Sequence, residues 1–345
     1  MSFLDDKLIE LENLLIELNS TSIGRKTFLA AMPAMLAACA TTEKTRTREG
    51  DNTGQETEIT VEDEKKMTQE VLPQMRKDYP AINNPDMQNY INNLGQKIVR
   101  SNNLNGNPYN YNFTVVGVSY VNAFALPAGT VFVTAPLIAM ADTEAELAGV
   151  VGHEVGHIKA RHTAERMDVA KKEESKTWKY AVGGGVIGGL AGLGLGAVMC
   201  KNETGGSKTT CMAKYAAIGG AAGAAGGLLI QKYSFMANSR EDEMEADRIG
   251  FRTSVGANFS KDKVGDFYEK LLEMEKQSKG NSNEIVARIS DAMSTHPPSK
   301  ERVEQMKQLA AESPQKSNAI VSSNEFDRIK RMAVEWSNQN PPKRG

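Results

Sequence analysis

The chain has 345 residues, of which 40% are hydrophobic and 24% are charged, a composition typical of one large or two modest globular domains. With 41 basic and 43 acidic residues, the formal net charge is -2, so no basic field indicates nucleic acid as a partner. Only three cysteines and four histidines occur, which excludes a cysteine-rich zinc module.

Residues 1–38 are predicted to be an N-terminal extension and a lipoprotein-type signal. Arg25-Lys26, an apolar run and the small residues before Cys39 follow one another as in a secretory signal. Leu36-Ala37-Ala38-Cys39 resembles the bacterial lipobox, which implies cleavage before Cys39 and a diacylglycerol thioether on its sulfur. The alternative is a chance cysteine after a short buried helix. The polar residues 39–59 cannot form a core and are predicted to be a flexible linker.

The predicted globular part begins with two helices. Thr60 and Asp63 indicate the start of the first, with an interruption near Pro73 and an end at Tyr79-Pro80. The second is predicted over residues 86–100, where apolar residues recur at helical spacing. Both are expected to cover a core.

A small antiparallel sheet is predicted next. Residues 113–119 and 130–134 are rich in β-branched residues and alternate with period two, and residues 127–129 form the turn region. We expect an edge strand that contains Asn122, Ala123 and Phe124 to align a peptide substrate through main-chain hydrogen bonds.

The segment His153-Glu154-Val155-Gly156-His157 is an H-E-x-x-H run on a predicted helix that starts at Asp142 or Thr143. This spacing places both imidazoles on one helix face, where they can bind one zinc ion, with Glu154 beside the metal. On its own, such a run can also match by chance on a buried helix. Gly149, Gly152 and Gly156 are unfavourable in a helix interior by ~1 kcal/mol each, which suggests that another backbone packs closely there.

A glycine- and alanine-rich insert, residues 181–230, is predicted to form a helical hairpin. Cys200 and Cys211 lie at the two ends of its polar loop and can form a disulfide in an oxidising compartment. One arm approaches the ~20 residues needed to span a bilayer. We favour a tightly packed soluble pair or a membrane-docking element over a true span.

Three further helices are predicted after the insert. The acidic segment 239–247 is expected to be helical, Ser260 opens an amphipathic helix, and His296-Pro297-Pro298 precedes a helix from Ser299. Residues 313–345 are predicted to be a polar helical C-terminal tail. The metallopeptidase domain is thus predicted to be residues 60–312.

Two histidines leave a zinc ion without its third protein ligand. His162 would project ~140° away from His157 on a continuing helix, and we expect it to be a packing or surface residue. Spacing alone leaves Glu241, Glu243 and Glu245 open as the third ligand.

Four ordered blocks resemble one zinc metallopeptidase family, which includes HtpX, the CAAX prenyl proteases, BepA and LoiP. The resemblance covers roughly residues 60–310 and rests on Asn122 to Pro127, Glu146 to His157 with Arg161-His162, Ser239 to Asp247, and Thr295 to Pro298. It implies an α+β, mainly helical zincin-like fold of the gluzincin type. One departure is Ala128, where the family often has a second glycine, and another is the insert before Glu243.

The resemblance also implies roles for individual residues. It makes His153, His157 and Glu243 the ligands of one zinc ion per chain and Glu154 the general base. Asp247 would hold a histidine ring, and His296 would stabilise the oxyanion or occlude the metal.

The function that we expect is zinc-dependent endopeptidase activity in the bacterial cell envelope, on unfolded or misassembled proteins. We expect a periplasmic enzyme attached to the membrane, the outer rather than the inner, through lipidated Cys39, with the insert as a second contact. The alternative is a non-enzymatic, chaperone-like assembly factor that uses the zincin fold as a scaffold.

Overall fold

The computed structural model describes residues 55, 57–106, 108–168, 238–278, 292 and 295–341. The predicted signal with Cys39, most of the linker, and the insert with Cys200 and Cys211 lie outside these residues. Within the part of the chain that is described, no helix is both long enough and apolar enough to cross a membrane.

The first two helices form where the sequence predicts them. Helix α3 (Val61–Asp78) starts with a capping box between Thr60 and Asp63, and α4 (Pro85–Ser101) starts at Asn84. Pro73 lies inside α3 without ending it. The expected interruption is therefore absent, since a proline removes one hydrogen bond and need not break a helix that is packed along one face.

The sheet has three strands, β1 (Asn112–Val116), β2 (Ala123–Leu126) and β3 (Thr130–Thr134), in the order β1-β3-β2. Strands β2 and β3 are antiparallel and are joined through the turn η1 (Pro127–Gly129), as expected. Strand β1 pairs in parallel with the far side of β3, so the sheet is mixed and not antiparallel. The reason is topological, because the chain crosses to the β2 position before it returns as β3.

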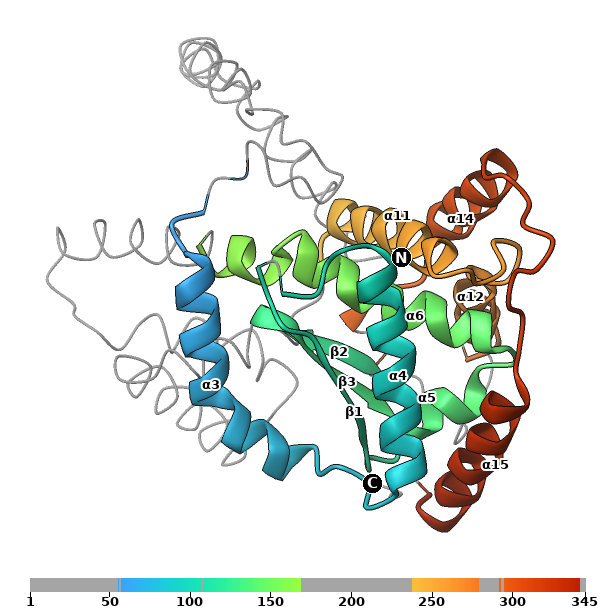
Figure 1. Ribbon diagram of the computed structural model, residues 1–345, viewed down its shortest axis with the longest axis horizontal. Coiled ribbons are helices and arrows are strands. Elements are labelled where there is room, and N and C mark those ends of the chain that lie inside the picture. The colour runs from blue at the N-terminus through green and yellow to red at the C-terminus, as the bar shows by residue number, and fades with distance from the viewer. Residues whose placement is uncertain are drawn as a thin grey trace, which may run out of the picture. The chain divides into compact units, whose positions relative to one another are not determined.

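Each face of the sheet is covered by helices (Figure 1). On one face, Val71 and Met75 of α3 pack in a cluster with Phe124 and Phe132. On the other face, α4 lies so close to β1 that a side chain at Gly95 would overlap the ring of Phe113. The main core continues from there to α5 (Ala135–Met140) and α6 (Glu144–Lys159). A mainly helical α+β fold with a small sheet is thereby confirmed.

Helices α6 and α11 (Arg240–Gly256) lie antiparallel and almost backbone to backbone. An added Cβ at Gly152 would lie 2.7 Å from the carbonyl oxygen of Gly250, and one at Gly156 would lie 2.7 Å from that of Ala246. One turn earlier, the Ser254 hydroxyl donates to the carbonyl oxygen of Ala148 at 2.8 Å. The close backbone approach that the glycines of α6 suggested is confirmed.

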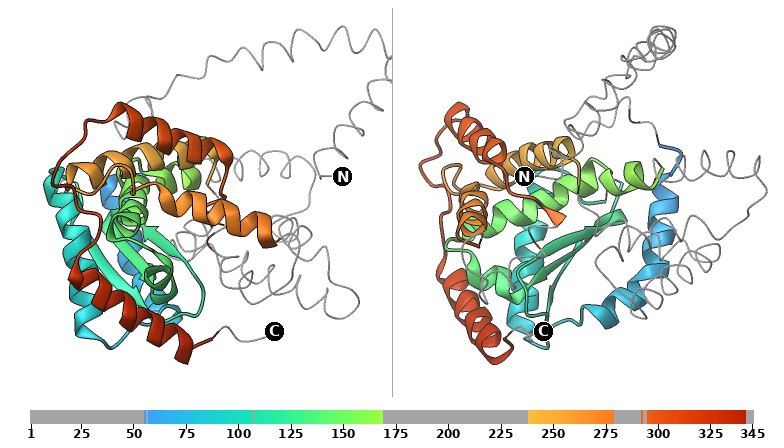
Figure 2. Two further views of the ribbon diagram at one scale, coloured as in Figure 1. Left: turned by 90° about the vertical axis from the view of Figure 1, so that its right-hand side faces the viewer. Right: turned by 180° about the vertical axis from the view of Figure 1, so that it is seen from behind.

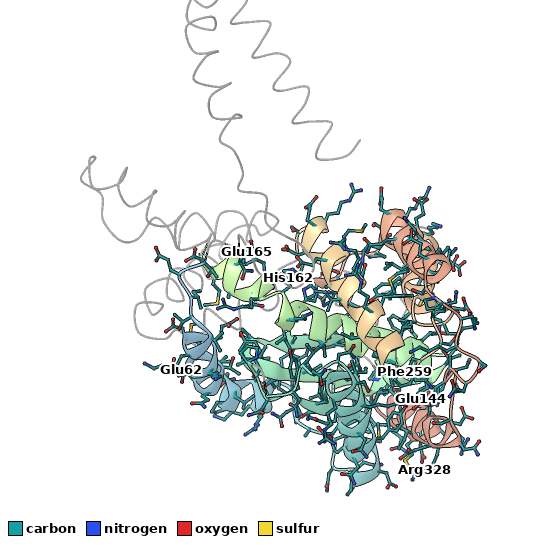
Figure 3. All side chains as sticks on the ribbon, turned by 45° about the horizontal axis from the view of Figure 1, so that its top comes forward. Glu62, Glu144, His162, Glu165, Phe259 and Arg328 are labelled. Atoms are coloured by element: carbon teal, nitrogen blue, oxygen red, sulfur yellow. The ribbon has the colours of Figure 1, made fainter. Side chains whose placement is uncertain are left out.

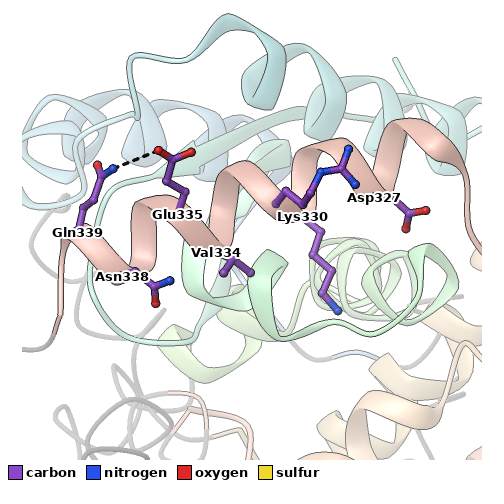
Figure 4. Close-up of a pocket in the computed structure, with 7 residues that line it drawn as sticks. Asp327, Lys330, Val334, Glu335, Asn338 and Gln339 are labelled. Atoms are coloured by element: carbon purple, nitrogen blue, oxygen red, sulfur yellow. Dashed lines mark hydrogen bonds between the residues drawn. The ribbon is translucent and has the colours of Figure 1, made fainter.

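The last two helices lie apart from each other (Figure 2). Helix α14 (Lys300–Glu312) packs on α11 and α12 (Asp266–Ser278), and α15 (Asn324–Gln339) packs on α4 and α5. The expected polar tail thus contains a helix that buries Phe326, Ile329 and Ala333 completely. Figure 4 shows its opposite, polar face, from Asp327 to Gln339.

Candidate metal centre

Helices α6 and α11 bring three predicted metal ligands together in the interior. The Nε2 atoms of His153 and His157 lie 2.9 Å apart. The Glu243 carboxylate reaches both rings, with Oε1 3.2 Å from His157 Nε2 and Oε2 3.4 Å from His153 Nε2. His296 joins them, with Nδ1 3.2 Å from His153 Nε2. One potential ligand atom from each of the four residues lies within 4.8 Å of the others, so the group could hold a metal ion.

The donor set fits zinc in both chemistry and size. Imidazole nitrogen and carboxylate oxygen bind zinc at ~2.0–2.2 Å, which puts neighbouring ligand atoms of a tetrahedral site about 3.3 Å apart. The separations among His153, His157 and Glu243 are 2.9, 3.2 and 3.4 Å. Two ring nitrogens that face each other at 2.9 Å also need a shared proton or cation between them, because two lone pairs would repel.

Asp247 and Arg302 lie behind His153. Asp247 Oδ1 is 2.8 Å from His153 Nδ1. Arg302 donates two hydrogen bonds to the same carboxylate, at 2.7 and 2.8 Å, and its Nη1 lies 2.7 Å from Glu243 Oε2. The ring of Tyr268 lies 4.7 Å from the Arg302 guanidinium carbon. One buried arginine therefore fixes both carboxylates.

His162 lies behind His157, which corrects the expectation that it points elsewhere. Its Nδ1 is 2.8 Å from His157 Nδ1, and its side chain is fully buried. Figure 3 labels His162 just beyond the end of α6. The expectation assumed one continuous helix, but α6 ends at Lys159 and Arg161 has a positive φ of 56°. This left-handed residue turns the chain so that the ring of His162 lies against Nδ1 of His157, on the side away from the metal centre.

Comparison with known proteins identifies the family. The sequence profile of peptidase family M48 matches residues 85–310, which include every residue of this centre. The chain belongs to peptidase family M48. Since M48 peptidases are metal-dependent, the chain is a metallopeptidase, and the predictions of the family and of enzyme activity are confirmed.

Several M48 relatives resemble the chain over different lengths. The beta-barrel assembly-enhancing protease of Escherichia coli is 27% identical over 79% of this chain and 48% of its own length. Metalloprotease LoiP of the same organism is 38% identical over 28% of this chain and 36% of its own length. The mitochondrial metalloendopeptidase OMA1 of Saccharomyces cerevisiae is 29% identical over 54% of this chain and 42% of its own length. The chain thus spans about half the length of the assembly-enhancing protease.

The charges of this M48 site favour a cation at its centre. Burial lowers the pKa of His153, but the negative charges of Glu243 and Asp247 outweigh that effect and raise it to about 9. Burial and the neighbouring His153 keep the pKa of His157 well below its usual value. The pKa values of Glu243 and Asp247 are lowered despite burial, chiefly by Arg302. Both carboxylates are therefore ionised, and they attract either a proton or a metal ion.

A small cavity lies on the side of the centre that faces β2. Asn122 and Ala123 lie beside His153 and Glu154 at a small cavity. The rest of its lining is mainly apolar: Leu137, Val150, Phe267, Leu271 and Ala292. His296 borders the same cavity, with Nε2 3.4 Å from Glu154 Oε1.

Among the strands that the structure describes, β2 lies at an edge of the sheet. Thr134 N donates to the carbonyl oxygen of Asn122, which makes these two a hydrogen-bonded pair of the ladder. In an antiparallel ladder such pairs alternate with pairs whose N–H and C=O groups point away from the partner strand. Ala123 and Ala125 therefore direct their main-chain groups away from β3, toward the open edge. Phe124 pairs with Phe132, and its side chain is buried against α3.

Three residues of the centre were missed by the sequence reasoning. Arg302 follows the His296-Pro-Pro block, but no spacing rule separates it from the exposed basic residues around it. Asn238, whose amide donates to Glu243 Oε1, directly precedes the acidic segment and carries no motif. The position of His162 depends on the turn at Arg161. One signal could have indicated Arg302: two buried carboxylates, Glu243 and Asp247, need a cation nearby.

Proposed function

We propose that the chain is a zinc-dependent endopeptidase of the bacterial cell envelope that cleaves unfolded or misassembled proteins. The observation that carries the proposal is the convergence of His153, His157 and Glu243 beside Glu154 and the open edge of β2. His153, His157 and Glu243 would hold the ion, with Asp247 orienting the His153 ring. When bound, zinc supplies a positive charge that polarises the scissile carbonyl and lowers the pKa of a coordinated water.

Glu154 is the general base in this proposal. It is buried and lies at the cavity between the ligands and β2, where the scissile bond of a bound peptide would lie. Its carboxylate takes a proton from the attacking water and returns it to the leaving amine.

Substrate recognition rests mainly on the main chain. A peptide that adds to β2 forms main-chain hydrogen bonds with Ala123 and Ala125, which do not depend on the peptide's side chains. The mainly apolar lining of the adjacent small cavity favours an apolar side chain beside them. Folded proteins bury both extended main chain and apolar side chains, so this combination selects unfolded segments.

His296 regulates access in this proposal. Its Nδ1 lies 3.0 Å from Glu243 Oε1, and its ring stands between the ligands and Glu154. In this position it occludes the space that a substrate carbonyl would need. Displaced by a peptide, its ring N–H can donate to the developing oxyanion.

The envelope location is supported by the lipobox-like sequence before Cys39. The name of the bacterial relatives, beta-barrel assembly-enhancing protease, also fits a role in the assembly of envelope proteins. Anchoring through Cys39 can be tested by labelling cells with a palmitate probe, which should label the wild type and not Cys39→Ala.

The decisive experiment compares Glu154→Gln with the wild type for cleavage of unfolded casein and for zinc content by mass spectrometry. We expect the variant to keep one zinc per chain and to lose at least about 100-fold in cleavage rate, because only the proton acceptor is removed. Glu62→Gln, at an exposed site on α3, is the control and should retain full activity.

Two results would contradict this proposal. A Glu154→Gln variant that cleaves at the wild-type rate would remove Glu154 from the mechanism. If zinc-loaded wild type and His296→Ala both leave unfolded proteins intact but bind them, the non-enzymatic assembly factor would replace the endopeptidase.

A further inference from the structure

A continuous hydrogen-bonded chain extends from the metal centre into the protein behind His157. His157 Nδ1 lies 2.8 Å from His162 Nδ1, and His162 Nε2 lies 3.2 Å from Glu245 Oε2. The planes of the two rings are inclined at 71°, so their nitrogens meet edge to edge. His162 and Glu245 are both fully buried, and water cannot replace either contact.

The positions of the protons in this chain follow from the geometry. His157 Nε2 faces Glu243 and His153, so in a metal ligand the lone pair is on Nε2 and the proton is on Nδ1. That proton points at His162 Nδ1, which must then be unprotonated. The remaining proton of His162 is on Nε2, where it faces an acceptor, the carboxylate of Glu245. Each donor therefore meets one acceptor.

We propose that His162 is a positioning residue that, together with Glu245, fixes the ring orientation and the tautomer of His157. The inference rests on the proposed role of His157 as a zinc ligand. A carboxylate that accepts the free N–H of a metal-bound histidine commonly serves this purpose. Here the carboxylate acts through an inserted imidazole, whereas His153 is held by Asp247 directly, at 2.8 Å.

The local backbone explains why His162 lies between His157 and the Glu245 carboxylate, an arrangement that we call the relay. The positive φ of Arg161 folds the chain after α6 back, so that the ring of His162 fills the space behind His157. Glu245 lies two residues after Glu243 on α11, and its side chain points to His162 and not to the metal centre. The sequence left both Glu243 and Glu245 as candidates for the third metal ligand. In the structure, Glu243 lies at the metal centre and Glu245 contacts His162.

The test compares His162→Leu with His162→Gln in the full-length zinc-loaded protein. Leucine removes both polar atoms, whereas the glutamine amide can accept from His157 and donate to Glu245. Zinc affinity is measured by competition with a chromophoric chelator. We expect a loss of about 10- to 100-fold for His162→Leu and recovery of most of it by His162→Gln.

Nitrogen NMR of histidine-labelled protein provides a readout that a merely structural role would not change. The chain has only four histidines, so the ring signals can be assigned by single substitutions. We expect the Nδ1–H tautomer of His157 in the wild type and in His162→Gln, and a mixture of tautomers in His162→Leu. Glu245→Leu should repeat the effect of His162→Leu, and the double variant should be no worse than either, since the groups act in series.

Each outcome decides the proposal. Wild-type affinity and an unchanged tautomer in His162→Leu would overturn it. If His162→Leu does not fold, Glu245→Leu is the deciding variant, and wild-type affinity there would overturn the relay equally. Failure of the wild type itself to bind zinc would refute the proposed function. This result is distinguishable from a failure of the further inference, in which the wild type binds zinc and the variants bind it equally well.

Discussion

At the scale of single residues, the metal centre depends on the positive charge of Arg302, which is not one of the proposed metal ligands. Arg302 is buried and contacts Glu243 and Asp247 at the same time. Without a cation, two buried carboxylates this close would repel each other and take up protons. The arginine keeps Asp247 ionised to orient His153, and it holds Glu243 through one oxygen while the other faces His157.

We therefore expect Arg302→Met to destabilise the metal-free protein by about 3–5 kcal/mol, because it removes the buried cation that two buried carboxylates share. Arg302→Lys should fall between Arg302→Met and the wild type, since a single ammonium group cannot form the paired contact with Asp247. Urea unfolding in the presence of a chelator measures both effects.

A suitable control for Arg302 is Arg328→Met. Arg328 pairs with Asp86 at 2.7 Å, but both side chains are well exposed, so the loss should be below about 1 kcal/mol. Equal losses at Arg302 and Arg328 would show that the buried cation has no special role.

The sequence could indicate the residues of the centre that belong to motifs, and little beyond them. The H-E-x-x-H run and the acidic block pointed to the side chains that the structure brings together at α6 and α11. Arg302, Asn238 and His162 escaped because their roles depend on where a third helix and one left-handed residue place them. Residue spacing within a single helix carries no such information.

At the scale of elements, the distance between α6 and α11 determines whether the ligands meet. His153 and His157 come from α6 and Glu243 from α11, so the site closes only if the two backbones nearly touch. The glycines at 152, 156 and 250 make that possible. The cost of Gly152 and Gly156 to helix propensity was visible in the sequence, and it correctly indicated a close backbone. The parallel pairing of β1 was not visible, because period-two alternation does not specify which strand becomes the neighbour.

Gly156→Ala should accordingly weaken metal binding without touching a ligand. Its Cβ would lie 2.7 Å from the carbonyl oxygen of Ala246 and 3.0 Å from its Cα, so the helices must separate and carry Glu243 away from His157. We expect a stability loss of about 1–3 kcal/mol from overpacking, offset in part by the helix propensity of alanine.

Zinc titration and urea unfolding of Gly156→Ala measure these effects. Gly256→Ala is the control, because its nearest contact is the side chain of Asn102 and lies away from α6. An unchanged zinc affinity in Gly156→Ala would show that α6 and α11 can move apart without disturbing the metal ligands.

At the scale of the whole domain, α15 and the segment just before it support α6, the helix that carries His153 and His157. The Ser322 hydroxyl accepts a hydrogen bond from the Glu144 amide and the Val321 carbonyl accepts one from Ala145, both in the first turn of α6. Tyr90 of α4 donates to the Glu144 carboxylate at 3.1 Å, and its ring lies 6.4 Å from that of Phe326. The polar composition of the tail concealed this role, since only a narrow stripe of α15 is apolar.

Phe326→Ala should therefore be among the costly substitutions of the domain although Phe326 lies outside the matched family region. The side chain is fully buried between α15 and the core, and its removal should cost about 3–5 kcal/mol. Val334 on the same helix faces outward and is 39% exposed, so Val334→Ala should stay within about 0.5 kcal/mol of the wild type. Urea unfolding compares the two variants, and hydrogen exchange at Glu144 and Ala145 should rise only in Phe326→Ala. Equal stability of the two variants would mean that α15 contributes little to the fold, and that the other neighbours of α6 hold it in place.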